Sequence, residues 1–295
     1  MPVDPDIDRA GWTAWRELAL AEPVSAEVLG EILDGGQSFR WRRSPDGWVG
    51  AFGPRVAELA PAPRGVRWRQ PRGAPDVEVA LARYLDAEGA QARAADALPW
   101  RSDAFLARAM EGRRGLRILR QEPDEALLAF LCSSNKQVAQ IRVMVAELAD
   151  RLGEPLAGGL RALPTWERLA RAPEAELRAC RLGYRAAFIR DTARRHAARP
   201  DWAAGLAGLP TAELEARLAE LPGVGPKVAA CVALFGFGRL DAFPVDTWID
   251  QALVEGYGLD GWNRRQLARF GAAHYGPAAG LAQQFLFAAM RSGPA

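Results

Sequence analysis

A nine-residue stretch, LPGVGPKVA (Leu221–Ala229), constrains the fold of this chain more than any other segment. A helical stretch, Thr211–Leu221, precedes it, and an apolar helix follows it through Phe235. The two glycines predict a tight turn whose backbone N–H groups face outward at a helix N-terminus, where they can bind a DNA phosphate. We therefore predict a helical hairpin over 211–235. Its predicted phosphate contacts are Gly223, Gly225 and Val228.

Two side chains near the hairpin indicate chemistry in addition to binding. Pro226 suits the first helical position, which places Lys227 in the first turn. There the positive end of the helix dipole favours the uncharged, nucleophilic amine. Nineteen residues later, in FPVDTW, Asp246 stands where another helix should begin, as an N-cap directed back towards the hairpin. A lysine and a carboxylate that converge on a DNA-facing surface fit a reaction at the sugar of a nucleotide.

The composition is that of a globular protein. Of 295 residues, 49% are hydrophobic and 25% are charged, which excludes a disordered chain. The net charge of +2 says little about nucleic-acid binding, because such binding needs cations on one surface. No apolar run approaches the roughly 20 residues of a membrane span. The acidic, proline-interrupted start MPVDPDIDRAGW does not resemble a signal peptide.

The residue usage also bears on cofactors and on location. The three cysteines, Cys132, Cys180 and Cys231, are too far apart for a disulfide framework or a zinc site. We therefore expect no metal and no cofactor. Abundant alanine, and an excess of arginine over lysine, indicate a GC-rich bacterial genome. We expect a cytoplasmic, nucleoid-associated protein.

Hydrophobic periodicity predicts strands in the first part of the chain. Phe39 and Trp41 alternate with polar neighbours, which predicts a strand over 37–42. Ser44–Gly47 (SPDG) predicts a turn, because Pro presets φ and Gly tolerates positive φ. Gly53-Pro54 predicts another turn. Further strands are expected at 48–52, 56–59 and 66–68, and together they form an antiparallel sheet.

From about residue 76 the pattern becomes helical. Pro123–Gly153 contains two amphipathic phases with a break at Cys132–Asn135, where Ser and Asn suit an N-cap. The last helix is expected from about Pro277 to Met290. The predicted fold class is α+β. We expect a sheet domain with flanking helices at 1–105 and a helical domain at 106–295.

These segments identify a resemblance to a known family. The hairpin followed by FPVDTW resembles the helix-hairpin-helix, Gly/Pro-rich, aspartate-containing (HhH-GPD) DNA glycosylases. Further segments, in the family's order, resemble its 8-oxoguanine DNA glycosylase branch and extend the match from about residue 25 to 290. These segments are Gly35–Trp41 (GGQSFRW), Leu116–Gln121 (LRILRQ), Phe130–Asn135 (FLCSSN), Leu182–Ala186 (LGYRA) and Ala279–Phe287 (AGLAQQFLF).

The resemblance implies a bifunctional DNA glycosylase and abasic-site lyase, acting on 8-oxoguanine flipped out of duplex DNA. Lys227 matches the lysine whose amine attacks C1′ of the deoxyribose, expels the base and forms a Schiff base that permits β-elimination. Asp246 matches the aspartate that stabilises positive charge on the sugar. The expected partner is double-stranded DNA carrying 8-oxoguanine, preferably opposite cytosine, and the protein is expected to be a monomer.

The resemblance also implies a pocket for the base. The backbone carbonyl of Gly36 would accept a hydrogen bond from N7–H, which 8-oxoguanine has and guanine lacks. Cys231 and Phe287 match the residues on the two faces of the base, and Gln283 matches the glutamine at its Watson–Crick edge. Without the resemblance, Gly36 would be an ordinary turn, and Cys231 and Phe287 ordinary core residues.

Three further residues match those that fill the gap left by the flipped base and contact the orphaned cytosine: Asn135, Tyr184 and Arg185. Asn135 as a helix cap and Tyr184 as a core aromatic are the ordinary alternatives. Animal and yeast members carry an arginine where this chain has Gln140, and a histidine near a DNA phosphate where it has Trp248. We therefore expect weaker selectivity for cytosine.

Two other functions stay open from the sequence. One is a monofunctional alkylbase glycosylase of the same superfamily, which typically lacks the lysine after the hairpin. The other is a non-catalytic helix-hairpin-helix DNA-binding module, which needs neither the Lys227 and Asp246 pair nor the base pocket. Both histidines, His196 and His274, match no functional position, and we expect them to be structural or exposed.

Overall fold

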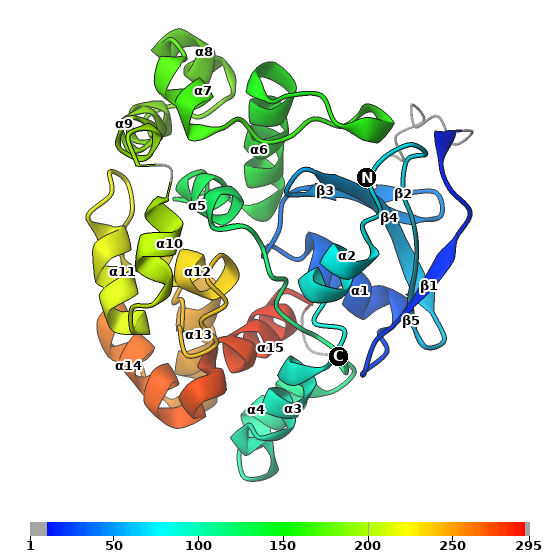
Figure 1. Cartoon of the computed structure of the whole chain (residues 1–295). Coiled ribbons are helices and arrows are strands. Elements are labelled where there is room, and N and C mark those ends of the chain that lie inside the picture. Colours follow the sequence, from blue (N-terminus) through cyan, green and yellow to red (C-terminus); the bar gives the residue numbers. More distant parts are fainter. Residues whose placement is uncertain (1–10, 200, 293–295) are drawn as a thin grey trace.

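The computed structural model describes residues 11–199 and 201–292. The first ten residues, on which the prediction about a signal peptide largely depends, lie outside the described residues. The described chain starts with a five-stranded antiparallel sheet in the order β1-β5-β4-β3-β2 (Figure 1). The strands are β1 (Arg16–Ala19), β2 (Trp41–Ser44), β3 (Gly47–Phe52), β4 (Arg55–Ala62) and β5 (Gly65–Arg69).

Helices make up the rest of the fold. One of them, α1 (Ala26–Asp34), lies between β1 and β2 along the chain and contacts β2 and β4. The α+β prediction is confirmed. The other α-helices are α2 (Glu78–Tyr84), α3 (Ala90–Asp96), α4 (Ala104–Met110), α5 (Pro123–Leu131), α6 (Val138–Leu152), α7 (Trp166–Arg171), α8 (Glu174–Ala179), α9 (Arg185–Ala197), α10 (Trp202–Ala207), α11 (Thr211–Ala219), α12 (Pro226–Phe235), α13 (Thr247–Tyr257), α14 (Arg264–Tyr275) and α15 (Ala279–Ser292).

The predicted hairpin turn is present, but the strand before it starts later than predicted. Ser44 pairs with Gly47 across the turn at Pro45-Asp46. Strand β2 begins only at Trp41, so the strand prediction was wrong for residues 37–40. The reason is the side chain of Gln37, which donates to the carbonyl of Arg117 (2.9 Å) and accepts from the N–H of Leu119 (2.8 Å). These bonds connect the segment to another loop instead of a strand.

The sequence did not reveal strand β1. Its four residues pair with β5 in antiparallel register, from Arg16 opposite Trp68 to Ala19 opposite Gly65. Only Leu18 of the four is buried. A short edge strand with one buried residue carries no period-two signal, so the period alone could not identify it.

The break between α5 and α6 lies where it was predicted, but the residue that caps α6 is not the predicted one. The N-cap of α6 is Gln137, whose backbone N–H donates to the side chain of Gln140 at 3.2 Å in a capping box. Asn135 instead has a left-handed backbone (φ 53°) and an exposed side chain. The interpretation of Asn135 as a helix cap was therefore wrong.

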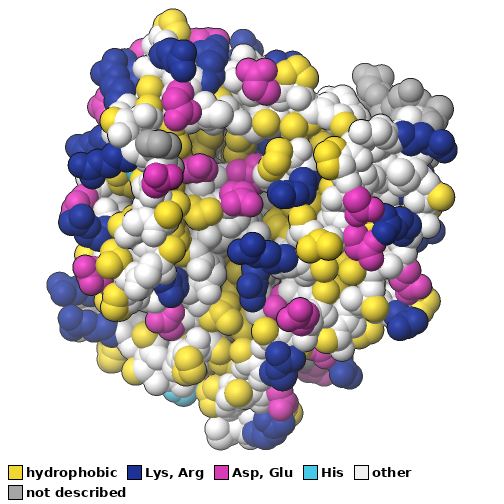
Figure 2. Space-filling model, in the orientation of Figure 1, with side chains coloured by type: hydrophobic (Ala, Val, Ile, Leu, Met, Phe, Trp, Pro, Cys, Tyr) yellow, Lys and Arg dark blue, Asp and Glu magenta, His cyan; other side chains and the backbone are white. Residues whose placement is uncertain are grey.

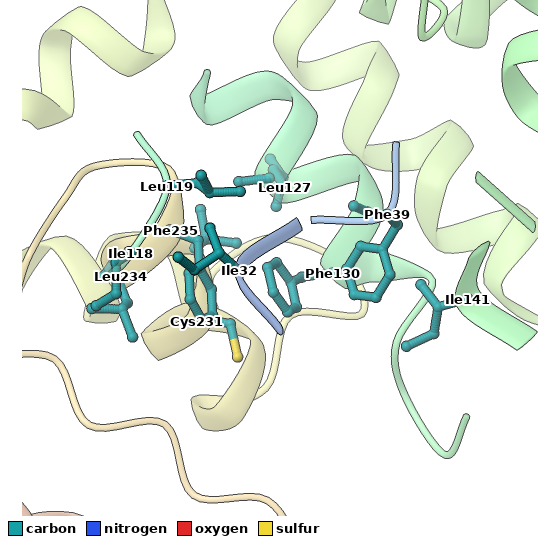
Figure 3. Packing of buried hydrophobic residues seen from close by; sticks show 14 of the residues in the cluster. Ile32, Phe39, Ile118, Leu119, Leu127, Phe130, Ile141, Cys231, Leu234 and Phe235 are labelled. Atoms are coloured by element: carbon teal, nitrogen blue, oxygen red, sulfur yellow. The ribbon is translucent and has the colours of Figure 1, made fainter. Parts of the chain in front are cut away.

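One hydrophobic core joins the sheet to the helices. Phe39, in the loop before β2, packs edge-on against Phe130 of α5, with ring centroids 5.7 Å apart. On its other side Phe130 stacks on Phe235 of α12 at 5.2 Å. Figure 3 shows Phe130 between Phe39 and the α12 residues Cys231 and Phe235. Helix α5 therefore couples the position of the sheet to that of the hairpin.

A cluster of aromatic side chains around Asp124 joins α5, α7, α9 and α10. The indole N–H groups of Trp166 and Trp202 both donate to Asp124, at 2.6 and 2.7 Å. The ring of His196 packs against both tryptophans, at 5.2 and 4.2 Å between centroids. Burial lowers the pKa of His196 to about 4, so the imidazole is neutral at physiological pH. This placement agrees with a structural role for His196.

The buried histidine predicts a loss of stability in mild acid. As pH falls below about 6.5, the unfolded chain takes up a proton that the folded His196 refuses until about pH 4. The free energy of unfolding should fall by about 2–3 kcal/mol across this range, and His196→Phe should abolish that part of the fall. Urea unfolding of both proteins between pH 7 and pH 4 measures it. Equal pH dependence in the two proteins would contradict this assignment.

Candidate active site

The predicted helical hairpin is present, formed by α11 and α12 around Gly223 and Gly225. Gly225 is the N-cap of α12 and Pro226 its first residue. The first bond of the helix runs from the N–H of Ala229 to the carbonyl of Gly225 (2.9 Å). The N–H groups of Lys227 and Val228 precede that bond and have no partner within the helix. The side chain of Val228 is buried, so a phosphate contact at this position would use the backbone.

An aromatic side chain supports the hairpin turn. Gly223 has a left-handed backbone (φ 79°), and a methyl group at this position would lie 2.7 Å from the ring of Phe188. Phe188 of α9 is 38% exposed and contacts Tyr184 edge-on, with centroids 6.0 Å apart. The sequence interpretation missed Phe188. Its position four residues after Tyr184, on the same face of a helix, was the available signal.

Lys227 points towards the turn that follows α5. Its ammonium nitrogen, Nζ, donates to Oγ of Ser133 at 3.3 Å and lies 5.4 Å from the ring centroid of Phe130. The Ser133 hydroxyl donates its own hydrogen to the carbonyl of Phe130 (2.7 Å). The Oγ lone pairs therefore face the lysine. This arrangement holds the amine at a defined place on a half-buried surface.

Lys227 and Asp246 both lie close enough to Cys231 to act electrostatically on its thiol. Asp246 is the N-cap of α13, as predicted, and accepts from the N–H of Ile249 at 2.9 Å. Burial raises the pKa of the Cys231 thiol to about 11, opposed by the Lys227 ammonium and assisted by the Asp246 carboxylate. The thiol is therefore neutral at physiological pH. A neutral thiol is a poor nucleophile, which leaves the amine as the reactive group.

The small number of lysines in the chain leaves few candidates for a reactive amine. Of 38 basic residues only two are lysines, Lys136 and Lys227. Arginine stays charged in proteins and cannot act as an amine nucleophile. Lys136 directly follows Asn135 and is exposed. Both side-chain amines therefore flank the Ser133–Asn135 turn.

The structure brings Gly36 and Phe287 together. Gly36 has a positive φ of 120°, and a methyl group there would lie 3.0 Å from Val138 and 3.6 Å from the ring of Phe287. Arg291 connects the last helix to this turn: it donates to Glu31 (2.9 Å) and to the carbonyl of Gly35. Gly36 therefore packs directly beside the Phe287 ring, and any larger residue at this positive φ would crowd Val138.

Gln283 occupies the same helix as Phe287 but makes a different contact. It is buried, and its Oε1 accepts a hydrogen bond from the side chain of Gln284 at 2.7 Å. Phe287 is 9% exposed. Gln283 therefore has its amide oriented by its neighbour, and the described contacts do not join it to Gly36.

The residues predicted to fill the gap in the duplex come from two adjacent turns. Tyr184 is 51% exposed, so its interpretation as a core aromatic was wrong. Arg185 stacks on the Tyr184 ring at 4.4 Å and donates to the carbonyl of Ser134. Arg185 thus joins its own turn to the Ser133–Asn135 turn. Trp248, in the first turn of α13, is 42% exposed.

The described residues contain neither a metal-binding cluster nor a membrane-spanning helix. Across residues 11–199 and 201–292, no group of three or more His, Cys, Asp and Glu side chains is arranged to hold a metal ion. Within the same part of the chain, no helix is both long and apolar enough to cross a bilayer. Figure 2 shows Lys and Arg interspersed with Asp and Glu over the face that it presents, rather than gathered in one patch.

A glycine-turned hairpin with Lys227 in the first turn of its second helix, followed by Asp246 as a helix N-cap, agrees with a helix-hairpin-helix base-excision DNA repair protein. The family model of that description, the HhH-GPD superfamily base excision DNA repair protein, matches residues 128–273. The model for the 8-oxoguanine DNA glycosylase N-terminal domain matches residues 20–127. N-glycosylase/DNA lyase OGG1 of Arabidopsis thaliana is 34% identical over 98% of this chain and 84% of its own length. The chain belongs to the 8-oxoguanine DNA glycosylase family.

Solved structures agree with this assignment. An 8-oxoguanine glycosylase/lyase of Clostridium acetobutylicum, solved with double-stranded DNA carrying cytosine opposite 8-oxoguanine, matches with a TM-score of 0.82 and 28% identity. That match covers 90% of this chain and 91% of the other. A 3-methyladenine DNA-glycosylase from Archaeoglobus fulgidus matches with a TM-score of 0.73 at 17% identity and shares the fold. The predictions of family and of enzyme class are confirmed.

The two hairpin glycines give a matched pair of variants. Gly223→Ala places a methyl group against Phe188 at positive φ and should lower the free energy of unfolding by about 1–3 kcal/mol. Gly225 has a φ of −87°, and a methyl group at this position would have no atom within 4 Å. Gly225→Ala should therefore lower the free energy of unfolding by less than about 1 kcal/mol. Chemical denaturation measures both. Equal losses would show that Phe188 does not constrain the turn.

Proposed function

We propose that this protein excises 8-oxoguanine from duplex DNA and then cleaves the strand, with Lys227 as the nucleophile and Asp246 as the charge-stabilising carboxylate. The observation that carries the proposal is the hydrogen bond from Lys227 to Ser133. Lys227 and Cys231 lie four residues apart on α12 and therefore on the same face of that helix. The names of its relatives support the same activity. The relatives from Arabidopsis thaliana and Saccharomyces cerevisiae are both named as N-glycosylase/DNA lyases.

The proposed reaction begins at the amine. The nitrogen lone pair of Lys227 forms a bond to C1′ while the bond from C1′ to N9 breaks, and the base leaves with that electron pair and takes up a proton. The Asp246 carboxylate stabilises the positive charge on the sugar. The bond from C1′ to O4′ then breaks, one proton passes from the attached nitrogen to O4′, and an iminium between Lys227 and C1′ is left. Loss of a proton from C2′ then expels the 3′ phosphate, which cleaves the strand.

We assign the base to the space between Cys231 and Phe287, with the backbone carbonyl of Gly36 at its edge as the acceptor for N7–H. The neutral thiol supports packing rather than chemistry for Cys231. Gln283 is assigned to the Watson–Crick edge, with its amide oriented by Gln284. Gly223, Gly225, the backbone of Val228 and Trp248 are assigned to DNA phosphates. The division at residues 105 and 106, the monomeric state and the bacterial nucleoid location stay predictions.

We assign Asn135, Tyr184 and Arg185 to the gap and to the orphaned base, with cytosine as the preferred base. Gln140 has its side-chain oxygen in the capping box of α6, so it contributes less to that preference than an arginine would. The alkylbase alternative rests on a likeness of fold at 17% identity. The non-catalytic alternative leaves the pair of Lys227 and Asp246 without a role.

The function is tested with a duplex oligonucleotide that carries one 8-oxoguanine. The protein should release the base and cleave the strand without added alkali. Lys227→Gln should bind the duplex with an affinity within about threefold of the unmodified protein and yield neither product, because the glutamine amide is not nucleophilic. Gel separation with and without alkali distinguishes base release from strand cleavage. Strand cleavage by Lys227→Gln would contradict the assignment.

Asp246 caps the N-terminus of α13, and its carboxylate is proposed to stabilise positive charge on the sugar. One substitution distinguishes these two roles. Asn is as good an N-cap as Asp, so Asp246→Asn should leave the free energy of unfolding within about 1 kcal/mol of the original. Its single-turnover excision rate should fall about 10²–10³-fold, because the stabilising charge is lost. An Asp246→Asn protein that excises at the original rate would leave Asp246 as a cap alone.

A further inference from the structure

A hollow of about 230 Å³ lies outside the residues assigned so far, apart from Gln140. Its lining residues are Lys136, Gln140, Val143, Met144 and Arg181. They come from α6, from the end of the turn before it, and from the turn that precedes Tyr184. The hollow is therefore formed where the two turns assigned to the gap in the duplex meet.

The hollow and the active-site amine lie at opposite ends of one short turn. Lys227 bonds to Ser133 at the start of the turn, and Lys136 at its end lines the hollow. Ser133 and Lys136 are three residue steps apart, which is at most roughly 10 Å. Asn135, which is assigned to the orphaned base of the opposite strand, directly precedes Lys136, so the hollow lies beside the part of the turn assigned to that strand.

The rim of the hollow is cationic. Among the described residues, no carboxylate lies within 4.0 Å of the Lys136 ammonium. The Arg181 side chain is 70% exposed, and its one nearby carboxylate, Glu147, is 3.8 Å away. Glu147 itself is held at 2.7 Å by Arg151. Two cations thus face solvent with little local compensation.

The floor of the hollow is apolar. Val143 is 41% exposed, whereas Met144 beside it is buried. The one uncharged polar side chain in the lining, Gln140, already has its oxygen bonded to the N–H of Gln137. Of the side chains that form the floor, only the Gln140 amide nitrogen is left to bond a base edge. A sugar ring on the valine and a phosphate between the cations suit the lining better.

We propose that this hollow binds a deoxyribose-phosphate unit of the strand opposite the lesion, with Lys136 and Arg181 on the phosphate and Val143 under the sugar. The proposal rests on the proposed function for the identity of the two strands. It assigns to this chain a backbone contact that holds the orphaned base in place without reading its sequence.

The test measures binding of the intact protein to duplexes that carry an abasic tetrahydrofuran opposite each of the four bases. The variants are Lys136→Gln, Arg181→Gln and the double variant. Arg178→Gln is the matched control, because Arg178 pairs with Glu174 on α8 and does not line the hollow. Each lost phosphate contact lowers the salt slope of log K by about 0.9. Because both cations are assigned to one phosphate, the double variant should lose about 0.9 in slope, equally for all four opposite bases, and the control should not.

Methylphosphonates then identify the strand. A neutral linkage beside the orphaned nucleotide should weaken the unmodified protein severalfold and leave the double variant unaffected. The same linkage on the lesion strand should weaken both proteins equally. Equal responses of both proteins to every opposite-strand linkage, or a loss confined to one opposite base, would overturn the proposal. Excision by the unmodified protein is scored separately, so a failure of the hollow and a failure of the proposed function are distinguishable.

Discussion

The packing of Phe130 is the interaction on which the rest of the structure depends. Its ring contacts Phe39 of the sheet unit at 5.7 Å, Phe235 of the hairpin helix at 5.2 Å and the Lys227 ammonium at 5.4 Å. One side chain of α5 therefore sets the sheet, the hairpin and the amine relative to one another. Gly36 lies three residues before Phe39, so the assigned base pocket follows the same packing.

Arginine and lysine have different tasks in this chain. Arg185 connects two turns through the carbonyl of Ser134, and Arg291 connects the last helix to the carbonyl of Gly35. A planar guanidinium with several fixed donors suits such connections. The two lysines lie at the two ends of the Ser133–Asn135 turn instead. One amine is half-buried beside a hydroxyl, and the other is exposed at a cationic hollow.

Local chemistry explains which features could be predicted from the sequence. The turn at Pro45-Asp46, the helix start at Pro226 and the cap at Asp246 depend on residues close together in the chain. The late start of β2 depends on the bonds of Gln37 to residues 80 and 82 positions away. A period-two pattern cannot contain that information. The roles of Phe188 and Arg181 likewise require the spatial meeting of distant turns.

The central claim is that Lys227 is the amine that attacks the sugar, and one measurement tests it most directly. Borohydride reduction of the reaction with 8-oxoguanine duplex should trap a covalent adduct, and peptide mass mapping should locate it. The chain offers two side-chain amines and its N-terminus as attachment points. The account predicts that all of the reduced adduct lies on the peptide containing Lys227. An adduct on Lys136 or on the N-terminal amine would contradict it.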